Sequence, residues 1–216
     1  MKKVFILAIS LLTAGVANAQ TKTKSSTASV GAVKFGVKAG VNLANIIKTG
    51  DNNFKTEFKP GFHAGIFVDI PVVDRLSFAP ELVYSQKGYK TTGTSLLGGA
   101  YDYNVTTNFI DVPILAKINA TPAFHIVLGP QVSFLTSTTT KYQSGSSQYQ
   151  QTINNENKNL KKSLVGGVIG LGFDISNKVS INGRYALDLQ RNNENGTSET
   201  PKYRNQVIQA GLAISF

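Results

Sequence analysis

Two histidines are the side chains in this sequence best suited to acid–base or metal chemistry. His63 and His125 are the only imidazoles, and the absence of Cys excludes a Cys-ligated metal, a disulfide scaffold and a thiol nucleophile. A histidine beside a serine and an aspartate can act as a general base in acyl transfer, so His63 with Asp51 and a loop serine leaves an enzyme open as an alternative. We expect both histidines to be hydrogen-bonded structural residues, with no catalytic residue, no metal and no cofactor.

Five charged residues stand singly in segments that are otherwise rich in apolar residues. They are Lys38, Glu81, Asp111, Arg184 and Asp188. A charge that leaves water must be paired, because an unpaired buried charge is strongly destabilising. We therefore predict that the five residues form a structural ion-pair network. Within it, Glu81 should lie within salt-bridge reach of Lys38 or Arg184.

The segments that carry these residues alternate apolar side chains with other side chains, which is typical of β-strands. Eight such segments lie within residues 35–43, 61–70, 76–85, 110–119, 124–134, 165–174, 179–189 and 207–216. Short connections at 71–74, 119–122 and 176–177 alternate with long polar ones at 47–59, 88–106, 137–162 and 191–205. This alternation places all the long loops at one end of an up-and-down antiparallel sheet.

The two faces of the predicted strands differ in charge. One face is almost free of charge, and the other combines glycines with the charged residues. In a soluble lipocalin-type barrel the apolar face points inward and the charged face meets water. If the charged face instead enclosed a dry apolar ligand cavity, removing so many charges from water would cost too much free energy. Short turns at one end and long loops at the other are typical of outer membrane barrels, whose interior is polar. We predict an all-β fold, an eight-stranded antiparallel up-and-down transmembrane β-barrel, whose narrow interior is filled by side chains.

The N-terminus predicts export. Two lysines precede an apolar stretch at 4–16, and residues 17–19 form a small-residue Ala-Asn-Ala site, the pattern of a secretory signal peptide. The apolar stretch is shorter than the roughly 20 residues of a membrane-spanning helix. We predict a signal peptide over 1–19 cleaved after Ala19, a flexible periplasmic lead-in over 20–33, and an outer membrane barrel domain over 34–216.

The net charge of +10 would by itself suggest an anionic partner such as nucleic acid. Two of these charges belong to the predicted signal peptide, and many others lie in the lead-in or the long loops. We therefore expect loop cations to meet anionic lipopolysaccharide at the outer surface, and we expect no nucleic-acid partner.

Several segments resemble one known family. FGVKAGVNLANI and PGFHAGIFVDIPVVDRLSFAPELVYSQKGYK resemble the first three strands of the PorT-like, or porin-family, outer membrane β-barrel proteins of Bacteroidetes. NFIDVPILAKINA is similar to the family's aromatic-Leu-Glu-Ile-Pro-Leu-Leu strand, with Ile110 in place of Leu and Asp111 in place of Glu. The closing GLAISF, which ends in Phe216, looks like the recognition signal for barrel insertion. The resemblance implies a fold and a location but no particular activity.

These features predict an integral outer membrane barrel with a packed polar lumen and long extracellular loops. Its role would be structural or in interactions, or it would carry out limited transport of small solutes. A narrow transport pore, a lumen-edge enzyme and a soluble lipocalin-like binding barrel remain as alternatives. We expect a monomer whose partners are outer membrane lipid, lipopolysaccharide and, during biogenesis, the barrel-assembly machinery. Tyr84, Tyr89, Tyr101 and Tyr103 should form the aromatic belt of the membrane interface, or alternatively a stacking platform for a sugar or a partner.

Overall fold

A computed structural model describes residues 31–48, 55–94, 100–144, 147–154, 160–192 and 202–216. The predicted signal peptide, the lead-in as far as residue 30, and Asp51 lie outside the described residues. Within the described ranges, no helix has the length and apolar character needed to cross a membrane.

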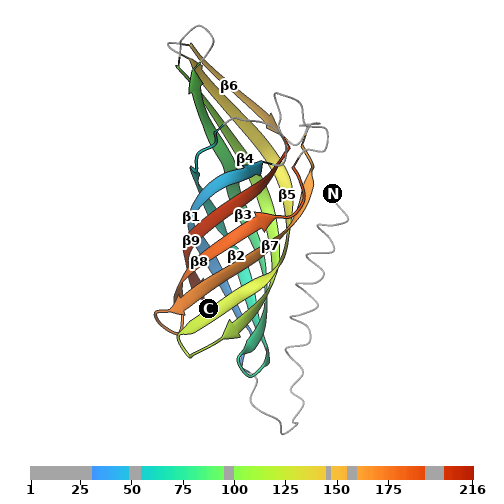
Figure 1. Ribbon diagram of the computed structural model, residues 1–216. Coiled ribbons are helices and arrows are strands. Elements are labelled where there is room, and N and C mark those ends of the chain that lie inside the picture. The colour runs from blue at the N-terminus through green and yellow to red at the C-terminus, as the bar shows by residue number, and fades with distance from the viewer. Residues whose placement is uncertain (1–30, 49–54, 95–99, 145–146, 155–159, 193–201) are drawn as a thin grey trace.

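The described residues form one antiparallel β-sheet. Its strands are β1 (Lys34–Lys48), β2 (Lys59–Val73), β3 (Leu76–Thr94), β4 (Ala100–Asn119), β5 (Phe124–Ser144), β6 (Ser147–Asn154), β7 (Ser163–Asp174), β8 (Val179–Asp188) and β9 (Tyr203–Ser215). Because β1 pairs with β9 and β4 pairs with β5, every strand except β6 belongs to a closed ring (Figure 1). The predicted all-β, eight-stranded antiparallel up-and-down barrel is confirmed.

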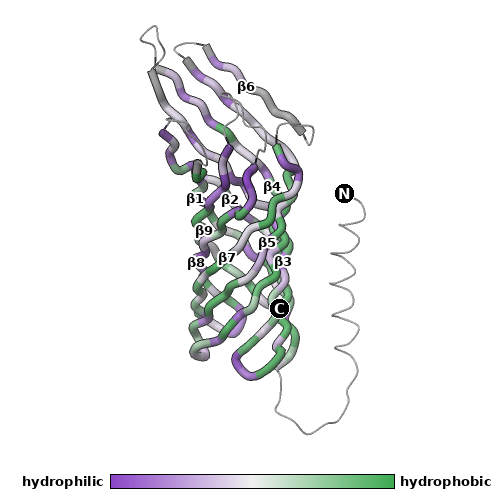
Figure 2. The backbone as a smooth tube through the Cα atoms, turned by 45° about the vertical axis from the view of Figure 1, so that its right-hand side comes forward, coloured by the Kyte–Doolittle hydropathy of each residue, from purple (hydrophilic) through white to green (hydrophobic). Residues whose placement is uncertain are grey.

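Period-two alternation sorts the side chains of each ring strand into an interior and an exterior set. On β1, Val37 and Val41 are 42% and 60% exposed, whereas Lys38 and Asn42 are 4% and 0% exposed. Hydrophobic residues follow the barrel wall in Figure 2, and few of them lie in β6. The soluble lipocalin-like alternative, which needs the apolar face inside, is therefore wrong.

The two ends of the barrel differ as predicted. The connections at 74–75, 120–123 and 175–178 are short, and they share one end with the start of β1 and the end of β9. We call this the turn end, and the opposite end the loop end. At the turn end, Arg75 has a φ of 66° in the tight turn from β2 to β3, a left-handed conformation that non-glycine residues adopt mainly in turns.

Two connections that the sequence predicted as long loops are largely strand. β3 and β4 run on through most of 88–106, and β5 with β6 fills much of 137–162. These residues pair above the apolar wall, so they need no apolar face and show no apolar alternation. They form what we call the loop-end sheet, residues 91–94, 100–104, 139–144 and 147–154, which projects beyond the ring in Figure 1.

The sequence predicted a polar interior, but the interior of the barrel is only partly polar. An apolar cluster lies among the interior polar groups, made of Ala44, Ala79, Leu115, Val127, Val168, Ala186 and Val207. All seven side chains are buried, and they come from seven of the eight ring strands. Polar and apolar groups thus both line the lumen.

Candidate functional site: the barrel lumen

The first polar cluster joins three interior residues from strands that are not neighbours in the ring. Lys38 Nζ on β1 donates to Glu81 Oε2 on β3 at 3.1 Å. Arg184 on β8 donates from Nη1 to Oε2 at 2.7 Å and from Nη2 to Oε1 at 2.8 Å. The structure therefore brings Glu81 to both of the partners considered from the sequence. A bidentate, charge-assisted pair of this kind is among the strongest polar contacts in proteins.

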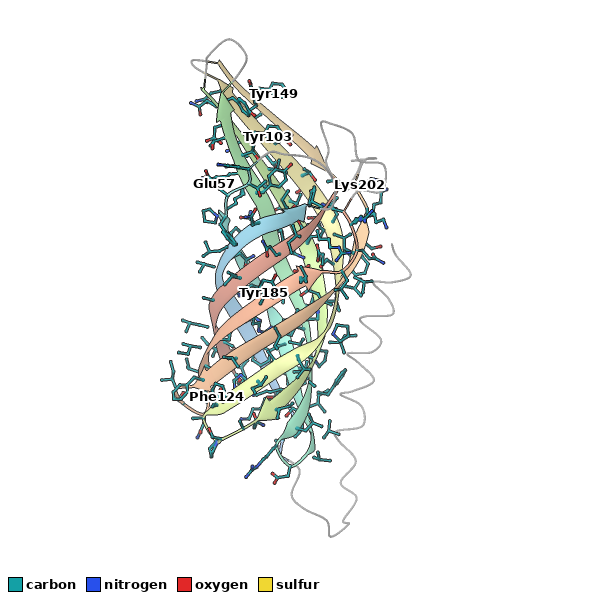
Figure 3. All side chains as sticks on the ribbon, in the orientation of Figure 1. Glu57, Tyr103, Phe124, Tyr149, Tyr185 and Lys202 are labelled. Carbon is teal, nitrogen blue, oxygen red and sulfur yellow. The ribbon has the colours of Figure 1, made fainter. Side chains whose placement is uncertain are left out.

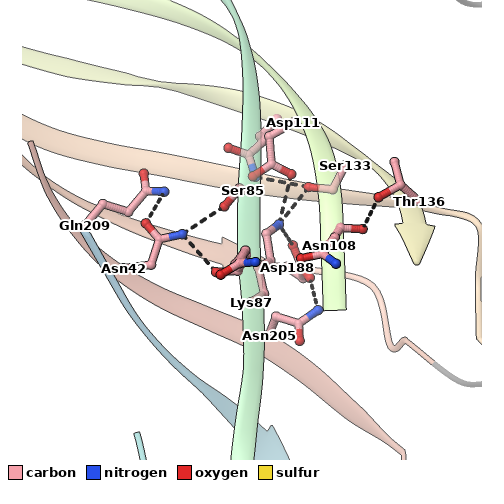
Figure 4. Close-up of polar contacts among 12 residues, drawn as sticks. Asn42, Ser85, Lys87, Asn108, Asp111, Ser133, Thr136, Asp188, Asn205 and Gln209 are labelled. Carbon is pink, nitrogen blue, oxygen red and sulfur yellow. Dashed lines mark hydrogen bonds and ion pairs between the residues drawn. The ribbon is translucent and has the colours of Figure 1, made fainter. Parts of the chain in front are cut away.

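The second cluster contains the other two predicted network residues, and its centre is Lys87. Lys87 Nζ lies 3.1 Å from Asp111 Oδ1 and 3.7 Å from Asp188 Oδ1, and it donates to Ser133 Oγ at 2.9 Å (Figure 4). Asn205 Nδ2 donates to Asp188 Oδ2 at 2.6 Å. Lys87 Nζ also lies 4.6 Å from the centroid of the Phe109 ring.

The predicted single network is therefore two separate clusters, and sequence reasoning missed the residue at the centre of one of them. Lys87 was left at the edge of a loop, although it continues the interior positions Glu81 and Ser85 at the same parity. The first cluster carries two cations and one carboxylate, and the second carries one cation and two carboxylates. Together the two clusters contain three cations and three carboxylates, so their formal charges cancel.

A neutral network around His63 lies between the two clusters along β3. His63 Nδ1 lies 2.8 Å from Asn42 Oδ1, which also accepts from Gln209 Nε2 at 3.1 Å. Asn42 Nδ2 donates to Ser85 Oγ at 3.1 Å (Figure 4). Because Asn42 Oδ1 is the acceptor, His63 Nδ1 carries the hydrogen. The imidazole bonds to an amide, so these contacts do not form the Ser-His-Asp arrangement of acyl transfer.

The turn end of the lumen holds a cavity of about 360 Å³. It reaches from the turn at 175–178 to Lys38 and Arg184, and His125 and Asn182 also line it. Lys117 Nζ donates to Asp69 Oδ2 at 2.8 Å beside it, and His125 Nδ1 lies 3.6 Å from Asp174 Oδ1. The two histidines thus belong to different networks, and the buried His125 Nδ1 has no hydrogen-bond partner in the described part of the chain. Among the described residues, no group of three His, Cys, Asp or Glu could hold a metal.

Aromatic and apolar side chains fill the loop end of the lumen. Tyr89 and Tyr203 meet edge to face with ring centroids 5.6 Å apart, and they pack with Ile46 and Val105. Asn192 Nδ2 donates to the Tyr203 hydroxyl at 2.6 Å. A neighbouring cluster consists of Phe109, Leu135, Leu160 and Leu164, all buried.

The predicted aromatic belt is wrong for three of its four tyrosines, since Tyr101 lies beyond the apolar wall, two residues from Tyr103 on β4, where it stacks with Tyr142. Tyr89 is 5% exposed inside the barrel, and Tyr103 packs against its cluster. Tyr89 and Tyr103 lie at interior positions of β3 and β4. The sequence analysis predicted a loop here and therefore did not assign these residues to a face of a strand. Tyr84 does lie on the outer face, where its ring contacts Phe62 at a centroid distance of 5.6 Å.

Phe216, the proposed insertion signal, lies at the turn end. Its backbone nitrogen donates to the Phe35 carbonyl at 2.8 Å, and its side chain is 77% exposed. The residue therefore closes the ladder between β9 and β1 while its ring stays accessible.

Several solved structures of outer membrane proteins are similar to this chain. Neisserial surface protein A is 16% identical, with 84% of this chain and 97% of that chain covered and a TM-score of 0.47. Ail, the attachment invasion locus protein of Yersinia pestis, is 10% identical, with 85% and 98% covered and a TM-score of 0.44. OmpT, the outer membrane protease from Escherichia coli, is 7% identical, with 89% and 99% covered and a TM-score of 0.45. Among curated proteins, no sequence match was found.

A family model provides the decisive comparison. The model described as outer membrane protein beta-barrel domain matches residues 18–214, which includes all eight ring strands except the last residue of β9. The closed ring, the apolar outer wall and the paired interior charges agree with that description. The chain therefore belongs to the outer membrane protein β-barrel domain family and is an outer membrane protein.

Proposed function

We propose that this protein is a non-enzymatic outer membrane barrel with a closed lumen, which acts through the surface it presents at the loop end. The observation that carries the proposal is the Lys38–Glu81–Arg184 cluster, which crosses the lumen from three strands that are not neighbours. Lys87 with its two carboxylates crosses it again. Side chains held by such pairs cannot move aside for a solute without breaking buried ion pairs, which costs several kcal/mol.

Conductance across a planar bilayer tests the closed lumen. We expect no stable open-channel current from the native protein after insertion. A matched variant in which Lys38, Glu81 and Arg184 are all replaced by Ala should pass more ions, because three crossing side chains are removed. Heat-modifiable gel mobility establishes that both proteins are folded barrels. A stable native current would reject the closed lumen.

A narrow transport pore is the second candidate, and one observation favours it. The cavity of about 360 Å³ at the turn end already reaches as far as Lys38 and Arg184. Only the layers between this cluster and the loop end would then have to open. A native current that disappears when the cavity is narrowed, for example by Ser180→Tyr in its lining, while gel mobility stays heat-modifiable, would support this pore.

The absence of enzymatic activity is also part of the proposal. His63 is bonded to Asn42 and lies 1% exposed inside the barrel, so it is poorly placed to meet a lipid substrate. Replacing His63 by Ala should leave the acylation pattern of outer membrane lipids unchanged. A changed pattern would favour the lumen-edge enzyme.

The proposed partners follow from the surfaces of a monomeric barrel. The apolar outer face would contact outer membrane lipid, loop-end cations would meet lipopolysaccharide, and Phe216 would be read by the barrel-assembly machinery. The signal peptide and the kinship with PorT-like barrels of Bacteroidetes belong to the same proposal. Salt-sensitive lipopolysaccharide binding and a failure of Phe216→Ala to insert are the expected results.

A further inference from the structure

Four tyrosines occupy one face of the loop-end sheet. Tyr103 on β4 stands opposite Tyr142 on β5, which in turn stands opposite Tyr149 on β6. Tyr101 precedes Tyr103 by two residues and therefore lies on the same face. We call these four residues the tyrosine face. Figure 3 shows Tyr103 and Tyr149 at the end of the molecule farthest from the turns.

The rings of the tyrosine face are held at its base and exposed at its tip. Tyr103 packs against the buried cluster of Tyr89 and Tyr203 inside the barrel. Tyr101 and Tyr142 stack with centroids 6.2 Å apart and an interplanar angle of 27°. Tyr142 is 37% exposed and Tyr149 is 59% exposed. The face is therefore anchored in the lumen packing, and its outermost rings are open to a ligand.

The tyrosine face lies well beyond the lipid-facing wall. On β5, Phe134 is the last apolar residue of the exterior set, and Tyr142 follows eight positions later. At about 3.3 Å per residue, the strand covers roughly 25 Å between them. Membrane lipid is therefore not the natural occupant of this surface.

The charge of the region limits what can bind. Residues 143–154 contain no Lys, Arg, Asp or Glu. The nearest cation in sequence, Lys141, pairs with Asn104 and so lies on the opposite face of the sheet from Tyr142. Asp102 likewise alternates with Tyr101 and Tyr103. Among the described residues, the tyrosine face carries no charge. Such a surface complements a ligand without charge, whereas phosphate or sulfate groups would meet none of the described cations on it.

We propose that the tyrosine face binds a neutral saccharide chain. A sugar ring presents apolar C–H faces and polar hydroxyl edges, and exposed tyrosines match both, since each offers a flat apolar ring and a phenolic hydroxyl. Tyrosine also loses little conformational entropy on binding, because its side chain has two rotatable bonds. The inference rests on the proposed function, which places the loop end outside the cell, where neutral glycans are met.

The test measures binding of defined neutral glycans to the full chain in detergent micelles. The probes are oligomers of glucose, mannose, galactose and N-acetylhexosamine, with sulfated and phosphorylated forms of the same oligomers. Because the chain has no Trp, tyrosine fluorescence reports binding directly. We expect at least one neutral series to bind and its charged form to bind more weakly. Tyr142→Ala with Tyr149→Ala should reduce the affinity about tenfold or more.

The controls separate stacking from folding. Tyr142→Phe with Tyr149→Phe keeps the rings and should retain most of the affinity. Tyr185→Ala removes a half-exposed tyrosine of the barrel wall and should leave glycan affinity unchanged. Heat-modifiable mobility should be the same in all variants, since Tyr142 and Tyr149 lie outside the ring of paired interior residues.

Three results would overturn the inference. They are binding by none of the neutral series, preference for the charged oligomers, and equal affinity in the doubly substituted Ala variant. Each of them leaves the conductance test of the closed lumen unaffected. If the native barrel conducts and still binds neutral glycans through Tyr142 and Tyr149, the proposed closed lumen is rejected and the glycan-binding inference stands.

Discussion

Arg184 binds both carboxylate oxygens of Glu81 across a sequence separation of 103 residues, with Nη1 and Nη2 at 2.7 and 2.8 Å. Lys38 Nζ shares Oε2 with Arg184 Nη1. Because β1, β3 and β8 are not adjacent in the ring, one carboxylate links three separate parts of the wall. Removing that carboxylate should affect the barrel as a whole.

Glu81→Gln should therefore destabilise the barrel strongly. The substitution keeps the shape of the side chain but leaves Lys38 and Arg184 as neighbouring buried cations without a counter-charge. We expect the free energy of unfolding to fall by about 3–5 kcal/mol, measured by urea unfolding in lipid vesicles. Asp74→Asn, in the exposed turn, should stay within about 0.5 kcal/mol of the native protein. Equal unfolding midpoints for both variants would show that the cluster contributes nothing.

Lys87→Met should leave the second cluster with two facing carboxylates. Asp111 and Asp188 lie 3.1 and 3.7 Å from Lys87 Nζ, and both side chains are buried. We expect a loss of about 3–5 kcal/mol in the same unfolding assay. Adding Asp111→Asn and Asp188→Asn to this variant should restore part of the stability, because the unpaired charges are gone. If the triple variant is less stable than Lys87→Met, the carboxylates do not depend on Lys87.

The strands of the barrel wall could be predicted from the sequence because their two faces meet different surroundings. Side chains therefore alternate between apolar and polar along each strand. Lipid requires apolar residues such as Val41 and Ile169 outside, and the packed interior accepts Lys38 and Glu81 only at the alternate positions. The sequence alone therefore shows that an isolated charged residue in such a segment faces the interior of the barrel.

The heights of the interior residues could not be read in the same way. Which interior residues meet depends on the stagger between strands in the closed ring, and this stagger separates Glu81 from Asp111 and joins Asp111 to Lys87. Above the apolar wall both faces of the sheet meet water, so the pairing of β5 with β6 leaves no apolar alternation to detect. For this reason the sequence analysis missed Lys87 as a cluster residue and assigned Tyr101 and Tyr103 to the membrane interface.

Gly172→Ala should disturb the packing of His125. The two residues are directly paired between β5 and β7, and a methyl group on Gly172 would overlap the imidazole ring. We expect a loss of about 1–3 kcal/mol from overpacking, largely recovered when His125→Ser is added. Gly183→Ala is the matched control, because a methyl group there meets no atom within 4 Å, and its unfolding should match the native protein. Full stability of Gly172→Ala would mean that the ring moves aside freely.

Ile169→Arg should reveal what the outer face contacts. Ile169 is 56% exposed, lies at the middle of β7, and stands between Leu128 and Tyr185 in the ladder. At the bilayer midplane an Arg costs about 2–4 kcal/mol, so stability in vesicles should fall by this amount. Gln150→Arg, on the exposed part of β6, should change it little. Because an exposed Arg in water is nearly neutral for stability, an unaffected Ile169→Arg barrel would contradict a lipid-facing wall.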